Sequence, residues 1–179
     1  MKKLLILLIS ISLTGCFSGN ENQKKIIDAD AKLQRDLEMY ENVWNTFISG
    51  DTSVMNENNF TKDIIVVTAE GNKVGIDQAL EHYKNYLTAF TDLEFNIIDA
   101  FGQGDRIVKH WNFKGKHTGD FFGIPATGNY LDLSGTTIVT MRDGKIAKEH
   151  DFFDMKSLLD QLTISDGEVV TIDEYQPVN

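Results

Sequence analysis

The chain has 179 residues, a net charge of −10 and a single cysteine. Its 27 Asp and Glu against 17 Lys and Arg argue against a nucleic-acid-binding protein, which needs clustered basic side chains. One cysteine excludes an internal disulfide and a cysteine-based metal site, so neither is expected.

The first sixteen residues follow the order of a bacterial lipoprotein export signal. Two lysines give a positive start, an apolar run covers residues 4–13, and small residues precede Cys16. The run is about ten residues long, whereas a membrane-spanning helix needs roughly 20, so residues 1–15 are predicted to be a signal peptide. The alternative is a soluble protein with an apolar N-terminal helix and a chance cysteine.

On the lipoprotein interpretation, Cys16 becomes the first residue of the mature chain and carries lipid. The signal holds two lysines and no acids, so the mature net charge is −12. Attachment to a membrane is therefore expected to depend on the lipid rather than on charge. The protein is then expected in the cell envelope, on a bacterial membrane and facing away from the cytoplasm, for example in the periplasm.

Residues 16–23 are predicted to form the lipidated cysteine and a polar spacer, residues 24–163 one folded domain, and residues 164–179 a tail. Apolar residues at helical spacing indicate a first helix from Lys24 to Gly50 and a second over 76–90. The predicted elements between them are a short helix at 54–58, a strand at 64–68 and a turn at 70–72.

Beyond residue 90 the apolar pattern changes to period two, which indicates strands. Hairpin turns are predicted at 102–105 and 143–144. The strands are expected at 93–101, 106–117, 130–141 and 145–153, followed by a helix at 155–162 and an apolar run at 169–172. This order is typical of an α+β fold, with N-terminal helices packed on a curved antiparallel sheet that encloses a cavity.

The strand over 106–117 carries an aromatic row. Alternation puts Trp111, Phe113 and His117 on one face, which is predicted to point inward because the opposite face is polar. The loop that follows is rich in Gly, Pro and Phe and is interpreted as a lid; alternatively, His117 only hydrogen-bonds its backbone. The predicted substrate pocket contains Tyr40, Trp44, Trp111, Phe113, Phe122 and Phe152.

A second cluster, over residues 149–154, combines carboxylate, imidazole and phenyl groups. Alternation groups His150, Phe152 and Asp154 on one face. An apolar wall raises the pKa of a carboxyl group and makes it a better base near neutrality. Asp154 is therefore the candidate catalytic base, with His117 or His150 beside it. The alternative is that Asp154 caps the next helix. Glu149 is expected to face solvent.

Other chemical motifs are missing. The sequence has no HExxH, Walker, dinucleotide-binding or GxSxG pattern. His82 and His110 are expected to be plain surface histidines, and spacing does not support a metal site at His117, His150 and Asp154.

Several segments together form a recognisable pattern, at 115–128, 135–138, 143–146, 153–154 and 158–162. They resemble the SnoaL-like polyketide cyclase (ester cyclase) family of the NTF2-like superfamily. The similarity covers about residues 37–162, and the stretch over 117–128 is its most specific part.

The resemblance implies a deep cone-shaped cavity, no cofactor, and an intramolecular aldol closure with an aspartate as acid/base. That aspartate matches Asp154, and His117 matches the histidine of the family's Gly-Thr-His-Thr-Gly run. Lys116, His150 and Thr163 depart from the Thr, Trp and Gly that are usual there. The lipid anchor also departs from the family, since aromatic-polyketide synthesis is cytoplasmic.

Three functions follow from the sequence. The first is cofactor-free ester cyclase chemistry on a small apolar carbonyl compound. The second is a non-catalytic ligand-binding module of the cell envelope, and the third is an interaction module whose sheet face docks a partner or a second copy as a homodimer. A buried Asp154 in the cavity favours the first, a capping Asp154 the second, and exposed aromatic residues on the sheet the third.

Overall fold

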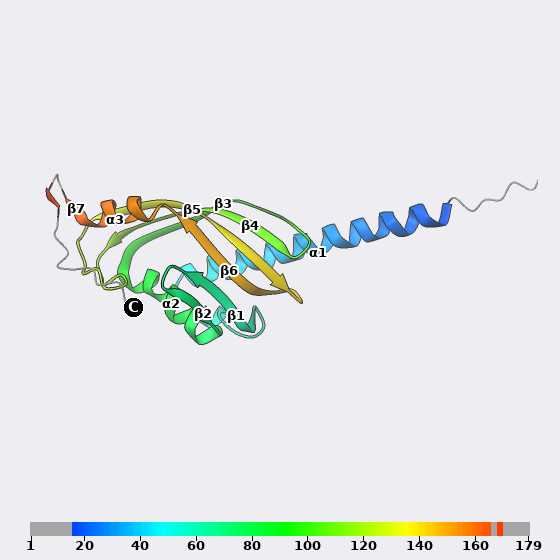
Figure 1. Cartoon of the computed structure of the whole chain (residues 1–179), viewed down its shortest axis with the longest axis horizontal. Helices are drawn as coiled ribbons and strands as arrows, with labels where there is room; N and C mark the ends of the chain where they lie inside the picture. Colours follow the sequence, from blue (N-terminus) through cyan, green and yellow to red (C-terminus); the bar gives the residue numbers. More distant parts are fainter. Residues whose placement is uncertain (1–15, 166–167, 170–179) are drawn as a thin grey trace, which may run out of the picture.

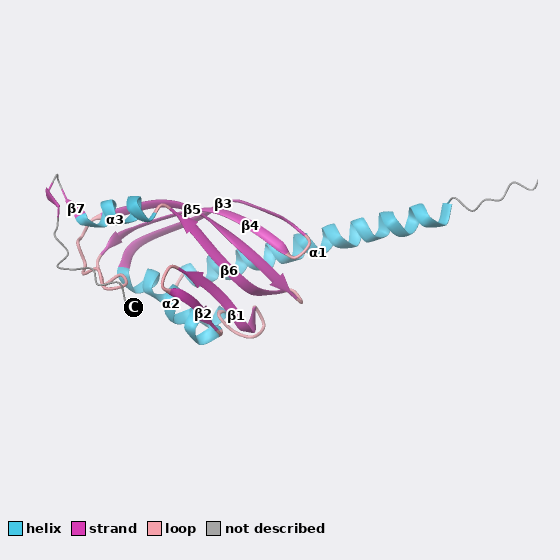
Figure 2. Cartoon of the chain, in the orientation of Figure 1, coloured by secondary structure: helices cyan, strands magenta, loops and turns pink. Residues whose placement is uncertain are grey.

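The computed structural model describes residues 16–165 and 168–169, and shows helices packed on a curved six-stranded sheet (Figures 1 and 2). The helices are α1 (Cys16–Ile48), α2 (Ile76–Ala89) and α3 (Met155–Thr163), with a 3-10 helix η1 (Thr52–Val54). The strands are β1 (Phe60–Thr68), β2 (Gly71–Val74), β3 (Phe90–Gln103), β4 (Arg106–His117), β5 (Tyr130–Arg142) and β6 (Lys145–Phe153), followed by a hairpin of β7 (Ile164–Ser165) and β8 (Glu168–Val169).

The sheet has the order β2-β1-β6-β5-β4-β3, and this topology confirms the α+β fold. Every neighbouring pair is antiparallel except β1 and β6, which are parallel. The sheet is therefore mixed rather than purely antiparallel. Figure 1 shows the long strands β3, β4 and β5 curving along one side, with α1 and α2 beneath them. Here α1 contacts β3, and α2 contacts β1, β2 and β3.

Helix α1 begins earlier than predicted, because it includes the residues expected to form a polar spacer. Those residues contain no proline, and extending an existing helix avoids the cost of nucleating a new one. Side chains 20–31 are all exposed, and this half of α1 projects beyond the sheet (Figure 1). Within the described residues, no helix is long and apolar enough to cross a membrane.

Other differences from the predicted elements are small. Strands β4 and β6 have the predicted bounds, whereas β3 is longer at both ends and β2 was not predicted. The short helix expected at 54–58 is instead the 3-10 turn η1, which Asp51 caps by accepting a hydrogen bond from the Ser53 amide. Of the apolar run at 169–172, only Val169 is described, in β8; the predicted signal peptide also lies outside the described residues.

Two groups of buried side chains form the core. The first lies between α1, α2 and the sheet, and includes Tyr40, Trp44 and Phe47 from α1. The second lies toward α3 and includes Trp111 and Phe113 from β4. Tyr86 and Phe95 pack against both groups, so their surroundings are where the two parts of the core meet.

Candidate functional site

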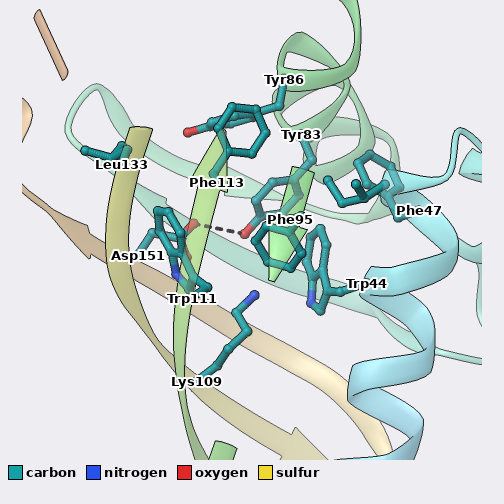
Figure 3. A pocket seen from close by; sticks show the side chains of 11 residues that line it. Trp44, Phe47, Tyr83, Tyr86, Phe95, Lys109, Trp111, Phe113, Leu133 and Asp151 are labelled. Atoms are coloured by element: carbon teal, nitrogen blue, oxygen red, sulfur yellow. Dashed lines mark hydrogen bonds between the residues drawn. The ribbon is translucent and has the colours of Figure 1, made fainter. Parts of the chain in front are cut away.

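An aromatic pocket lies at the junction of the two core groups (Figure 3). Helices α1 and α2 form one wall, and the inner face of strands β3 to β6 forms the other. Only two charged side chains, Lys109 and Asp151, are among those that line it. The lining residues are Trp44, Phe47, Ile48, Tyr83, Tyr86, Phe95, Lys109, Trp111, Phe113, Leu133 and Asp151.

Asp151 is held in place by a chain of hydrogen bonds. Its Oδ1 accepts a hydrogen bond of 2.5 Å from the Thr137 hydroxyl, which itself accepts one of 3.0 Å from the indole N–H of Trp111. Its Oδ2 lies 3.4 Å from the Tyr83 hydroxyl, the contact drawn as a dashed line in Figure 3. Because Thr137 is fully buried, this arrangement fixes the direction of the carboxylate.

Lys109 enters the pocket from β4 and is only 4% exposed. Its Nζ lies 4.7 Å from the ring centroid of Trp44, 5.0 Å from that of Tyr40 and 5.3 Å from that of Phe95. Ring faces attract a cation at these distances. Burial lowers the pKa of the Lys109 amine, and the nearby negative charges of Glu149 and Asp151 oppose that shift.

Glu149 lies beside the pocket and has no exposed surface. Its Oε1 accepts hydrogen bonds from the Tyr40 hydroxyl at 2.6 Å and from the Trp44 indole N–H at 3.2 Å. Its Oε2 is buried without a hydrogen-bond partner. Burial raises the pKa of Glu149 to about 7, although the positive charge of Lys109 acts in the opposite direction. The expectation that Glu149 faces solvent is therefore wrong.

In β6 the side chains that point inward are not the predicted ones, and an irregularity in the strand pairing is the cause. Counting in twos from buried Ile146 places His150 and Phe152 inside, as predicted. However, Thr140 pairs with Lys148 while Met141 pairs with Ile146, so β6 has one extra residue at this point. Such a bulge turns the following side chains to the other face of the strand. Glu149 and Asp151 consequently point inward.

The three residues predicted to do chemistry do not meet in the pocket. Asp154 is exposed, and its Oδ1 accepts a hydrogen bond from the Ser157 amide at 3.0 Å, which caps α3. His150 stacks on Phe152, with ring centroids 4.0 Å apart, on the outer side of β6. The expectation that Asp154 and Phe152 face an apolar cavity is thus corrected, and the capping alternative describes Asp154.

His117 is fully buried but does not line the pocket. Its Nδ1 lies 3.0 Å from the Thr127 hydroxyl, and its backbone pairs with Asn129 and Gly128. Burial lowers the pKa of its imidazole. His117 therefore holds the two ends of the following loop together, which is the alternative considered for it.

The loop after His117 reaches the pocket through its aromatic residues. Phe121 is buried, and its ring centroid lies 5.1 Å from that of Tyr86, which lines the pocket. Phe122 is 43% exposed and packs on Tyr86 and His82. The loop thus covers the Tyr86 end, while Phe122 itself is outside the lining.

The predicted pocket residues Trp44, Trp111 and Phe113 all line this cavity. Tyr40 lies next to it, below Lys109 and in contact with Glu149. The geometry is an apolar cavity with one oriented carboxylate and one buried amine. Among the described residues, no three His, Cys, Asp or Glu side chains gather as metal ligands would.

Comparison with known proteins identifies the family. A family model described as SnoaL-like polyketide cyclase matches residues 34–162. The chain belongs to the SnoaL-like polyketide cyclase family. No curated protein matches the chain.

Solved structures share the SnoaL-like fold of this chain. A candidate SnoaL-like polyketide cyclase from Jannaschia sp. CCS1 has a TM-score of 0.68 at 20% identity, over 73% of this chain and 92% of that one. IdmH, a candidate polyketide cyclase from Streptomyces antibioticus, has a TM-score of 0.60 at 21% identity, over 72% and 99%. TerC, crystallised with polyporic acid, has a TM-score of 0.59 at 20% identity, over 72% and 98%.

Sequence reasoning missed two charged groups that line the pocket of this SnoaL-like domain, and it placed one histidine wrongly. Lys109 has the same strand parity as Trp111, so alternation alone places it inside; its charge led to its omission. Asp151 was not predicted, because strict alternation along β6 ignores the bulge and places this residue on the outer face. His82, expected on the surface, is half-buried with an unpartnered Nδ1, and burial lowers its pKa, whereas His110 is exposed as predicted.

Proposed function

We propose that this SnoaL-like domain binds a small apolar carbonyl compound in the aromatic pocket and performs cofactor-free acid/base chemistry of the aldol type on it. The observation that carries the proposal is that Asp151 is the single carboxylate among the lining residues and is held in one direction by hydrogen bonds, in a wall that is mostly aromatic. Family membership supports the reaction class, and the pocket supplies the groups.

The chemistry needs a base and a donor. Asp151 would remove the proton from the carbon next to the carbonyl group, and the resulting carbanion would attack a second carbonyl of the same molecule. The Tyr83 hydroxyl and the Lys109 amine share the pocket with Asp151, so either could donate to the oxygen that becomes negative. This role falls to Asp151 because Asp154 is exposed and caps a helix.

The size of the cavity limits the ligand. It offers about 50 Å³ to the centres of water-sized atoms, and one water needs roughly 10–15 Å³ of such space. As the side chains stand, the pocket therefore favours a compact ligand over a polycyclic one. TerC, which shares this fold, was co-crystallised with polyporic acid, and this supports the proposal that the domain binds a ligand.

Gly135 provides the test of binding. Trp111 lies across this glycine, and a Cβ at position 135 would lie 2.3 Å from the indole Cζ2. We expect Gly135→Ala to push the indole into the cavity at a cost of about 1–3 kcal/mol. A loss of about 1 kcal/mol or more in the free energy of ligand binding corresponds to a drop in affinity of roughly fivefold or more.

The measurement is a tryptophan-fluorescence titration with methyl acetoacetate, a compact β-keto ester, since Trp44 and Trp111 both line the pocket. Ser134→Ala, on the exposed face of the same strand, is the matched control. Thermal melts of both variants check folding. Equal affinity in wild type, Ser134→Ala and Gly135→Ala would contradict binding in this pocket.

The alternative is a non-catalytic module of the cell envelope. The capping role of Asp154 favours it, because the matched family position is not available for catalysis. Phe101, Tyr130 and Phe152 are each about half exposed, which favours docking of a partner or a second copy on the sheet. Asp151 in the pocket is the reason for ranking the enzyme first.

We also propose that the domain is anchored through lipid on Cys16 to a bacterial membrane, facing away from the cytoplasm. The order of residues at 1–16 supports this, as does the exposed half of α1, which would separate the pocket from the membrane surface.

Cys16→Ser is expected to leave an unprocessed precursor without lipid, because the thiol is the group that would be acylated. Growth with a clickable fatty acid, followed by gel analysis of the purified chain, measures the label. Equal labelling of the wild type and the variant would refute the anchor.

A further inference from the structure

The surroundings of the buried Lys109 amine differ from those of a lysine that only stabilises the fold. Figure 3 shows its side chain rising from β4 into the pocket, between Trp111 and the rings of Trp44 and Phe95. A lysine that serves only structure is normally paired with a carboxylate when it is buried. In the described chain, no carboxylate oxygen lies within 4.0 Å of its nitrogen, and the ion pairs use Lys32, Lys62, Lys114, Arg142 and Lys156.

Burial of the amine favours its neutral form and lowers the pKa of the group. The three ring faces and the negative charges of Glu149 and Asp151 favour the charged form, but burial outweighs those two charges. The nitrogen of a desolvated lysine in an apolar pocket is a recognised nucleophile toward the carbon of a carbonyl group. Glu149, buried behind it with an unpartnered Oε2, has a raised pKa and can hold the proton that the amine gives up.

We propose that Lys109 forms a Schiff base with a ketone or aldehyde group of the ligand, so that the pocket performs enamine chemistry. This deepens the proposed function and rests on it, because the carbonyl compound must first bind in the aromatic pocket. The substrate class is therefore an aldehyde or a ketone. An ester without an aldehyde or ketone group cannot form the Schiff base.

The steps balance without an oxidant or a reductant. The neutral Lys109 nitrogen attacks the carbonyl carbon. One proton of the amine and one proton from Glu149 reach the oxygen, which leaves as water, and a protonated C=N bond remains. Asp151 then takes a proton from the adjacent carbon, and the electron pair forms the C=C bond of a neutral enamine. That carbon attacks a second carbonyl of the ligand, a C–C bond forms, and the new alkoxide takes the proton held by Asp151. Water finally hydrolyses the protonated C=N bond, which releases the product, frees the amine and returns one proton to Glu149.

The test uses acetylacetone, a compact β-diketone that forms a stable, conjugated enaminone with a neutral amine by loss of one water. The purified folded chain is incubated with it at neutral pH, and the intact mass, the near-ultraviolet absorbance and the modified peptide are recorded. We expect one adduct, of the mass of the diketone less water, on Lys109. Lys62, whose side chain is 79% exposed, is the internal control.

We expect Lys109 to be modified faster than Lys62, because a lowered pKa leaves a larger fraction of the amine neutral at a given pH and the pocket holds the diketone beside it. Lys109→Met should lose the adduct and its absorbance, and Lys109→Arg should lose both while keeping the positive charge. Peptide mapping of the wild type needs no variant, so poor folding of either variant does not remove the test.

Binding and adduct formation are measured separately. Acetylacetone that quenches the pocket tryptophans without modifying Lys109 would overturn the Schiff base and leave the proposed function standing. No quenching and no adduct, with this diketone or with methyl acetoacetate, would contradict both. Equal modification of Lys62 and Lys109 would also overturn the inference, because it would show no special reactivity.

Discussion

Asp151→Asn is expected to lower the turnover of β-keto esters by about 10²- to 10⁴-fold, the usual contribution of a positioned general base. Asparagine has nearly the same shape and still accepts a hydrogen bond from the Thr137 hydroxyl, which now contacts Oδ1. It cannot take a proton from carbon. The variant should therefore fold and bind ligand like the wild type while losing the chemical step.

Asp154→Asn is the matched control, because Asp154 is exposed and caps α3, and asparagine is an equally good cap. Rates for a β-keto ester panel are measured for both variants and the wild type, with thermal melts alongside. Equal rates in wild type and Asp151→Asn would remove Asp151 from the mechanism. A loss of turnover confined to Asp154→Asn would assign the base to Asp154, the position that matches the family. No turnover by any of the three proteins would favour the non-catalytic module.

Glu149→Gln is expected to remove a large pH dependence of stability. The pKa of Glu149 is raised from 4.5 to about 7 in the folded chain. Between these values the folded state holds a proton that the unfolded state has lost, so the free energy of unfolding falls as pH rises. The loss at this site is on the order of 3 kcal/mol, and it is complete above the folded pKa. Glutamine stays neutral and keeps an oxygen for Tyr40 and Trp44.

The measurement is urea unfolding at several pH values from about 4.5 to 7.5 for wild type and Glu149→Gln, with Glu94→Gln as an exposed control. The lowered pKa of Lys109 acts with the opposite sign, since the folded state then holds fewer protons and gains stability as pH rises toward 10.5. The difference between variants isolates Glu149. Parallel pH profiles for wild type and Glu149→Gln would show that its proton does not depend on folding.

Local patterns were enough to predict much of the fold. The period-two alternation and the turn at 143–144 predicted β4 and β6 with their observed bounds, and the apolar stripe at helical spacing predicted α2 to within one residue. These features depend on neighbours close in sequence, so they can be read without the fold. The motif over 115–128 likewise indicated the family that the comparison shows over 34–162.

The parallel pairing of β1 with β6 was decided by the tertiary structure. It joins segments that lie about 80 residues apart, such as Val66 and Glu149, whereas sequence patterns report mainly on adjacent hairpins. The spacer is a different case, because it is helical as a local continuation of α1 and not through tertiary packing; its side chains from residue 20 to 23 are exposed.

The residues that line the pocket were likewise predictable in part from the sequence and determined in part by tertiary structure. From the sequence alone, alternation placed Trp111 and Phe113 inside, since apolar side chains on one face of a strand face the core. Whether charged side chains join them depends on partners from other elements. Lys109 is stabilised inside by rings of Tyr40, Trp44 and Phe95, which come from α1 and β3. The bulge in β6 is set by its pairing with β5, and that pairing turned Asp151, rather than Asp154, toward the cavity.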